Sequence, residues 1–170
     1  MHIKNFFPVI ALIFLTSCND DMPEALSVHQ FVEDLKKGKY ESGYLPAFKP
    51  WEIPQLLNYA NDFQEIPRFP VNPISSYYPP SFRLGECLLW TIESIKKHYD
   101  NEDMMLKFPS LVPFLIKKGS ENNPESGMLN EAELLEVFGY YSNWWQQNSG
   151  KDFESFRYIN PLEGTDYSWR

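Results

Sequence analysis

A broad apolar stripe between residues 84 and 99 constrains the fold of this chain more than any other feature of its sequence. Apolar side chains recur there at intervals of three and four residues, which is the spacing of one helix face. The stripe consists of Leu84, Cys87, Leu88, Leu89, Thr91, Ile92 and Ile95. Glu86, Glu93 and Lys97 fall on the opposite side. The width of the stripe predicts a helix at the centre of the molecule, with its charged side in solvent.

Local signals predict two helices ahead of this stripe. Ser27 can cap a helix start, and Gln30, three residues further on, can complete the capping box with it. This helix should run to about Lys37 and stop at Gly38. A short helix should begin near Ile53-Pro54, because proline is tolerated in a first helical turn. The apolar face of the short helix is formed by Ile53, Leu56, Leu57 and Ala60.

Two more helices are predicted behind the stripe. Residues 109–118 carry a dense apolar run that ends on Lys117-Lys118-Gly119 in the manner of a helix C-cap. Asn130, with Glu133 behind it, predicts the start of a long helix that reaches Gln147. The side chains at helical spacing along it are Leu134, Val137, Phe138, Tyr141 and Trp145.

Residues 61–82 cannot form a helix or a central strand. Proline fixes φ and lacks an N–H group, and prolines recur throughout this segment. They are Pro67, Pro70, Pro73, Pro79 and Pro80. The segment also has too many aromatic and aliphatic side chains to remain in water, so we expect an ordered loop packed over the helices.

A weak internal repeat indicates how the helices are arranged. Residues 53–57 and 112–116 both read apolar-Pro-x-Leu-apolar, and HEAT-like repeats often start helices in this way. Residues 83–90 look like the second helix of such a pair. We therefore predict a single all-α domain of antiparallel, HEAT-like helices with a long ordered Pro-rich loop, although two copies do not establish a solenoid.

The charge of the chain limits its partners. It contains 15 Lys and Arg against 23 Asp and Glu, for a formal net charge of −8. A chain of this charge repels a phosphate backbone, so we do not expect nucleic acid binding. Aromatic residues make up 16% of the chain, which predicts a dense core rather than a disordered extension.

The N-terminus has the architecture of an exported lipoprotein. Lys4 supplies positive charge, and residues 6–15 form an apolar run of signal-peptide length that is too short to span a bilayer. The run closes on Leu15-Thr16-Ser17-Cys18, which resembles the bacterial lipobox, whose cysteine receives a diacylglycerol. An ordinary secretory signal with a chance cysteine is the alternative.

The residues after Cys18 bear on localisation. Asn19-Asp20-Asp21 looks like the acidic tract that carries many Bacteroidetes lipoproteins to the cell surface, and a solvated acidic tether is the alternative. We predict an outer-membrane anchor through the Cys18 lipid, exposed on the cell surface or facing the periplasm. The predicted organisation is a signal peptide over 1–17, a lipid-anchored tether over 18–26 and a helical domain over 27–170.

Three segments resemble those of a known family. They are Asn72-Pro73-Ile74-Ser75-Ser76, residues 83–93 and Asn160-Pro161-Leu162-Glu163-Gly164. In these segments the chain resembles Bacteroidetes lipoproteins catalogued only as a domain of unknown function. The resemblance covers most of the mature chain and implies the same anchor and a largely helical domain. It implies no activity and no catalytic residues.

No motif predicts a metal ion or a cofactor. The sequence has no His-x-x-x-His or Cys-x-x-Cys spacing, and His29 and His98 are far apart. The acidic residues that follow His98 could form a cation site with it. A protonated histidine that is favoured by the helix dipole explains His98 near a helix C-terminus equally well. These acidic residues are Asp100, Glu102 and Asp103.

No residue is assigned a catalytic role. Cys87 lies on the apolar stripe, where a buried and unreactive thiol is the commoner outcome. Glu86 and Glu93 share one helix face and could act as an acid/base pair. A solvated face on which Glu93 pairs with Lys97 is the simpler interpretation. An enzyme is therefore the minority hypothesis.

Aromatic doublets are the candidates for a binding surface. Tyr77 and Tyr78 lie in the Pro-rich loop, whereas Tyr140 and Trp144 lie on a flank of the last helix. Rings outside the core can stack on a sugar or anchor a protein partner. For Tyr140 and Trp144 a second layer of core is the favoured interpretation, and an exposed patch is the alternative. The four side chains are our candidates for the binding of a protein or a glycan.

The predicted function is that of an outer-membrane or cell-surface lipoprotein that acts as a binding or interaction module. An envelope hydrolase with a carboxylate acid/base pair is one alternative. A protective, immunity-type partner of a basic protein is another, for which the acidity of the chain is the only indication.

Overall fold

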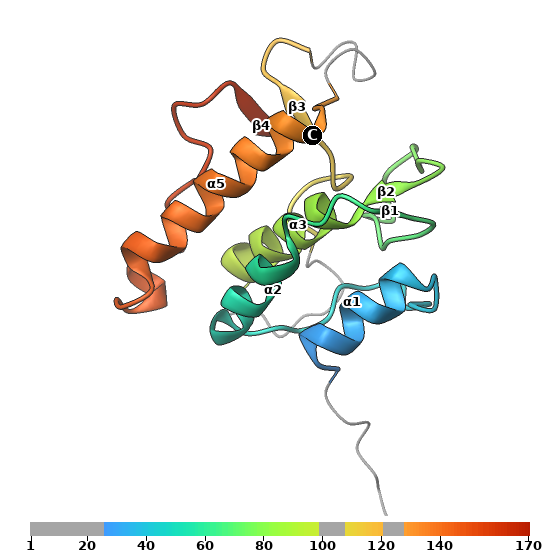
Figure 1. Ribbon diagram of the computed structural model, residues 1–170, viewed down its shortest axis with the longest axis horizontal. Coiled ribbons are helices and arrows are strands. Elements are labelled where there is room, and N and C mark those ends of the chain that lie inside the picture. The colour runs from blue at the N-terminus through green and yellow to red at the C-terminus, as the bar shows by residue number, and fades with distance from the viewer. Residues whose placement is uncertain (1–25, 99–107, 121–127) are drawn as a thin grey trace, which may run out of the picture.

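The computed structural model describes residues 26–98, 108–120 and 128–170 (Figure 1). Over these ranges the chain forms four α-helices, two 3-10 helices and four short strands. The α-helices are α1 (Val28–Lys36), α2 (Ile53–Tyr59), α3 (Leu84–His98) and α5 (Glu131–Asn148). The 3-10 helices are η1 (Pro50–Glu52) and η3 (Phe153–Ser155). The strands are β1 (Glu65–Ile66), β2 (Phe82–Arg83), β3 (Leu115–Lys117) and β4 (Tyr167–Trp169).

The strands form two small antiparallel sheets, β1 with β2 and β3 with β4. The prediction of an all-α domain is therefore wrong, and the fold is mixed α/β. The predicted repeat is not a structural one either. Residues 53–57 begin α2, whereas residues 112–116 lead into β3, so the same sequence pattern adopts two different conformations.

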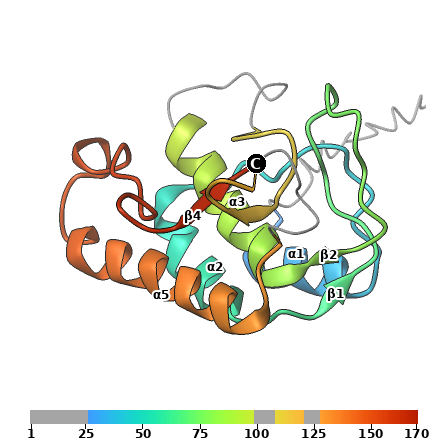
Figure 2. The same ribbon diagram turned by 90° about the horizontal axis from the view of Figure 1, so that it is seen from above.

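Helix α3 lies at the centre of the fold and packs against both α2 and α5 (Figure 2). Every side chain of the predicted apolar stripe is buried, which confirms that prediction. The solvent-facing side was wrongly predicted at Glu86, which is only 1% exposed. The reason is the β3 strand, because the Leu115 amide donates a hydrogen bond of 2.5 Å to Glu86 Oε1.

The helices with local start signals were predicted correctly. At α1, Ser27 Oγ accepts a hydrogen bond from the Gln30 amide at 3.1 Å. At α5, Asn130 and Glu133 form the full reciprocal capping box. Helix α2 begins where its proline predicted, and Ile53, Leu56, Leu57 and Ala60 are all buried. None of the helices in the described ranges has the length and apolar character needed to cross a membrane.

Residues 109–118 do not form the predicted helix. Residues 109–113 form bends that lead into β3, which pairs with β4 so that Leu115 lies opposite Trp169. A short apolar run does not distinguish a helix from a buried strand, and here the pairing with a distant segment decides. Gly119, predicted as a helix cap, instead follows the strand with a φ of +88°.

The Pro-rich segment leaves and rejoins the body of the protein through a short sheet. Strand β1 at its beginning pairs with β2 at its end, so the prolines lie in the excursion between them. Phe69 is buried within this excursion and holds it to the core, whereas Ile74 is 79% exposed. The excursion therefore has an anchored base and an exposed outer part.

Candidate functional site

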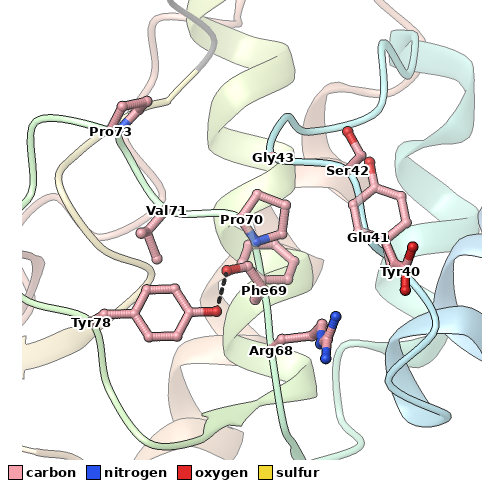
Figure 3. Close-up of a pocket in the computed structure, with 10 residues that line it drawn as sticks. All are labelled: Tyr40, Glu41, Ser42, Gly43, Arg68, Phe69, Pro70, Val71, Pro73 and Tyr78. Carbon is pink, nitrogen blue, oxygen red and sulfur yellow. Dashed lines mark hydrogen bonds between the residues drawn. The ribbon is translucent and has the colours of Figure 1, made fainter.

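A cavity of about 410 Å³ opens between the chain that follows α1 and the base of the Pro-rich excursion (Figure 3). We call it the tyrosine–proline cavity. Its lining residues are Tyr40, Glu41, Ser42, Gly43, Arg68, Phe69, Pro70, Val71, Pro73 and Tyr78. Its volume lies within the range typical of small-molecule sites.

Core contacts hold the wall of this cavity that follows α1. The Tyr40 ring packs edge-on against Phe31 with a centroid distance of 4.9 Å, and its hydroxyl donates to the Tyr44 carbonyl at 2.7 Å. Burial raises the pKa of the Tyr40 hydroxyl, so it remains a neutral donor. Gly38 allows the chain to turn into this wall, because its φ of +64° is unfavourable for other residues.

The opposite wall is held through Phe69, whose ring lies 6.3 Å from Phe31 and 6.0 Å from Trp90. Tyr78 packs edge-on against Phe82 with a centroid distance of 5.5 Å. Its hydroxyl reaches toward the Phe69 carbonyl at 3.5 Å, a long hydrogen bond (Figure 3). Tyr78 is 57% exposed, so much of its surface is available to a ligand.

Polar groups of both charges line the same cavity. Arg68 and Glu41 are exposed, and among the described residues neither forms a hydrogen bond or an ion pair. Ser42 adds a hydroxyl that bonds to the backbone of Tyr44. The cavity therefore offers donors, acceptors and aromatic rings with no net charge.

The structure does not bring the four predicted aromatic residues together. Of these, Tyr78 lines the tyrosine–proline cavity, and Tyr77 lies outside its lining with the Arg170 guanidinium 5.6 Å from its ring centroid. Tyr140 is half-buried and donates a hydrogen bond of 2.6 Å to Glu136. Trp144 is only 4% exposed and packs in the core, so its ring is not available at the surface.

A second cavity, of about 440 Å³, contains two tryptophans. Trp51 of η1 is 70% exposed, and Trp145 of α5 is half-buried. Pro50, Pro54 and side chains from the segment that follows α5 complete it. Trp51 was not predicted as a site residue, because nothing in the neighbouring sequence distinguishes an exposed tryptophan from a buried one.

A third cavity, of about 360 Å³, is rich in cationic side chains, and we call it the cationic cavity. Its lining residues are Glu93, Lys96, Lys97, Pro109, Arg157, Tyr158 and Trp169. Lys96 and Arg157 are charged yet buried, with exposures of 5% and 7%. This cavity was not predicted either, because its walls come from segments far apart in the chain.

The two carboxylates considered for acid/base chemistry lie in different surroundings. Glu86 lines none of these three cavities and is bonded to the Leu115 amide and, at 3.1 Å, to Arg83 Nε. Its burial raises its pKa to about 7, although Arg83 and the amide act in the opposite direction. Glu93 lines the cationic cavity and accepts hydrogen bonds there. They therefore do not converge on one cavity.

The remaining sequence candidates give no reactive group. Cys87 is buried, and burial raises the pKa of its thiol, which disfavours the reactive thiolate. Within the described ranges no three His, Cys, Asp or Glu side chains gather closely enough to hold a metal ion. The acidic group at Asp100, Glu102 and Asp103 lies outside the described residues.

Comparison with known proteins gives a family match over most of the chain. A family model described as "Domain of unknown function (DUF4943)" matches residues 22–170. No curated protein and no solved structure matches the chain.

Proposed function

This chain belongs to the family described as a domain of unknown function (DUF4943), and because that description assigns no activity, we propose a function from the chain's own residues. The protein is a lipid-anchored binding module of the bacterial cell envelope, and it takes a glycan in the tyrosine–proline cavity. Its origin among the lipoproteins of Bacteroidetes is part of the same proposal.

One observation carries the choice of ligand: Arg68 and Glu41 line the cavity beside Tyr78, and neither has a hydrogen-bond or ion-pair partner among the described residues. A sugar ring presents hydroxyl groups that require both donors and acceptors, which a guanidinium and a carboxylate supply. Its apolar C–H face packs on an aromatic ring, which Tyr78 supplies. The opposite charges balance, so the cavity suits a neutral glycan better than a charged ligand.

A binding role is better supported than the hydrolase alternative. A glycosidase requires two carboxyl groups that flank one bond of a bound sugar. Glu86 is enclosed between Arg83 and β3, and Glu93 lines a different cavity. Among the described residues, Glu41 is the one carboxylate that lines the tyrosine–proline cavity. The immunity-type alternative has no support beyond net charge.

The anchor is proposed from the residues that precede the family match. Leu15-Thr16-Ser17-Cys18 resembles a lipobox, and Asn19-Asp20-Asp21 looks like a surface-export tract. Metabolic labelling with a fatty acid should mark the protein, and Cys18→Ser should abolish the label. Protease added to intact cells should digest a surface-exposed protein. Protection in intact cells, with digestion after lysis, would instead place the protein in the periplasm.

The glycan proposal is tested with the full-length lipoprotein, purified in a detergent without a sugar head group and applied to an array of neutral glycans. Tyr78→Ala and Arg68→Ala should each weaken binding at least about tenfold, as expected for central contacts of a site. Tyr78→Phe should bind like the wild type, because its lost hydrogen bond is long and the ring is kept. Binding should change little with salt, because the ligand is neutral.

Tyr158→Ala is the matched control, since Tyr158 is 75% exposed and lies at another cavity. The proposal is wrong if no glycan binds, or if Tyr78→Ala and Tyr158→Ala bind equally well. Capture of a peptide at Tyr78 in place of any glycan would keep the site and replace the ligand.

A further inference from the structure

We propose that the cationic cavity is a second ligand site, which binds the carboxylate or phosphate group of a small anionic molecule. Its residues differ from those of the tyrosine–proline cavity, so it is independent of the proposed glycan site. The proposal rests on a buried ammonium group, a guanidinium fixed beside it and an excess of positive charge.

The buried ammonium belongs to Lys96, whose Nζ lies 2.7 Å from Glu93 Oε1. An ammonium carries three N–H donors, and Glu93 provides its one hydrogen-bond acceptor among the described residues. The Trp144 ring, 5.0 Å away, provides a further favourable contact but no lone pair. A buried cation is costly unless its donors find acceptors, which the oxygens of an anion supply.

Glu93 compensates Lys96 only in part, because the same carboxylate oxygen also serves other groups. Glu93 Oε1 accepts a hydrogen bond of 2.7 Å from the Tyr141 hydroxyl. That hydroxyl accepts one of 2.8 Å from Trp169 Nε1. This chain of bonds fixes the carboxylate and one wall of the cavity before any ligand binds, so the site is preorganised.

Arg157 fixes the backbone beside Lys96. Its Nη1 donates a hydrogen bond of 2.9 Å to the Lys96 carbonyl, and its Nε donates one of 2.7 Å to Glu154. Its guanidinium also lies 4.2 Å from the ring centroid of Tyr158, an exposed residue that lines the same cavity. A ligand that carries a ring beside its anionic group can contact this tyrosine.

The local charge is opposite to that of the molecule. Among the described residues, three cations line the cavity against one carboxylate, and Arg157 is also paired with Glu154, whereas the whole chain has a net charge of −8. A lysine near a helix C-terminus also interacts favourably with the negative end of the helix dipole, but that interaction does not require the side chain to be buried. Burial lowers the pKa of Lys96, and a bound anion would oppose this shift by favouring the charged ammonium.

The test uses the full-length protein in detergent micelles and isothermal titration with two anions, inorganic phosphate and D-glucuronate. D-glucose is the neutral comparison. We expect saturable binding of at least one anion, weakened by added salt, and none of glucose at this site. Lys96→Met should weaken anion binding at least about tenfold. Binding of phosphate alone identifies a phosphorylated ligand, and binding of glucuronate alone identifies a carboxylate.

Lys97→Glu keeps the test decisive if Lys96→Met fails to fold, because Lys97 is exposed and its replacement leaves the core intact. It should also weaken anion binding, whereas Lys39→Glu, the same charge change at an exposed lysine elsewhere, should not. The proposal is overturned if neither anion binds, or if the two charge-reversal variants bind alike. Tyr78→Ala should leave anion binding unchanged, which separates this result from that of the glycan test.

Discussion

Gly85 lies where two segments of backbone come too close for any side chain. A Cβ atom at this position would lie 2.2 Å from the carbonyl oxygen of Ala60. The Gly85 amide also donates a hydrogen bond of 2.7 Å to the Asp62 carbonyl. The start of α3 is therefore fixed directly against the end of α2, through backbone atoms that cannot move aside as a flexible side chain can.

Gly85→Ala should lower the free energy of unfolding by about 2 kcal/mol or more, because the added methyl group forces the two backbones apart. Gly139→Ala is the matched control, since a Cβ there meets no heavy atom within 4 Å. It should raise stability by about 0.5–1 kcal/mol, as alanine favours the interior of α5. Urea denaturation measures both, and equal stability of the two variants would contradict the structure.

Glu86 should make the protein less stable as the pH rises. Its pKa is raised from 4.5 to about 7 in the folded protein, so the folded state binds the proton more tightly than the unfolded state does. The protonated form is thus favoured by folding, and its contribution is lost as the pH rises through about 7. Relative to Glu86→Gln, the wild type should lose about 2 kcal/mol between about pH 5 and about pH 8.

Urea denaturation at several pH values measures this difference. Glu136→Gln provides a control of opposite sign, because hydrogen bonds from Tyr140 and Tyr167 lower the pKa of Glu136. Its contribution is therefore lost as the pH falls. Stability curves for Glu86→Gln that run parallel to the wild type at all pH values would show that Glu86 does not titrate in this way.

At the scale of elements, the sequence predicted structure where the deciding interaction is local. Ser27, Pro54 and Asn130 each act within their own helix, and all three helices were predicted correctly. Strand β3 was predicted as a helix, because its conformation depends on β4. The burial of Glu86 was missed for the same reason, since the amide that binds it belongs to β3.

Strand β4 should be essential to the fold despite its length. Tyr167 is buried and donates a hydrogen bond of 2.7 Å to Glu136, and Trp169 bonds to Tyr141. A chain that ends at Asp166 should lose roughly 3–5 kcal/mol of stability, mainly from the lost burial of two aromatic side chains. Ser168→Ala keeps the backbone pairing and should change stability by less than about 0.5 kcal/mol. Thermal unfolding followed by circular dichroism would show whether the truncated chain retains wild-type stability.

At the scale of the whole molecule, both proposed sites are assembled from distant segments, which explains how little of them the sequence predicted. Tyr78 was a candidate because aromatic doublets are visible in a sequence. Two polar residues line the cavity with it. Glu41 lies on another segment of the chain, and Arg68 lies beside a proline in the Pro-rich segment. No sequence motif connects either of them to Tyr78. Lys96 was not considered in the sequence, because the residues that line its cavity with it, such as Arg157 and Trp169, lie far from it in the chain.

The two sites should act independently, because they share no lining residue. Lys97→Glu should leave glycan affinity within about twofold of the wild type, and saturating phosphate should not change it, as expected for distant sites without shared partners. Titration of the glycan with and without phosphate measures this coupling. A change of tenfold or more would reveal a conformational link between the two sites.

The pairing of β3 with β4 also bears on the order in which the elements form during folding. Leu115 and Trp169 pair across a long stretch of chain, so forming this sheet carries a large loop-closure cost, whereas the helices form from neighbouring residues. The sheet should therefore form late in folding, and until then the surface that later encloses Glu86 remains open to water. In pulsed hydrogen exchange during refolding, the amides of residues 115–117 should gain protection after those of α3.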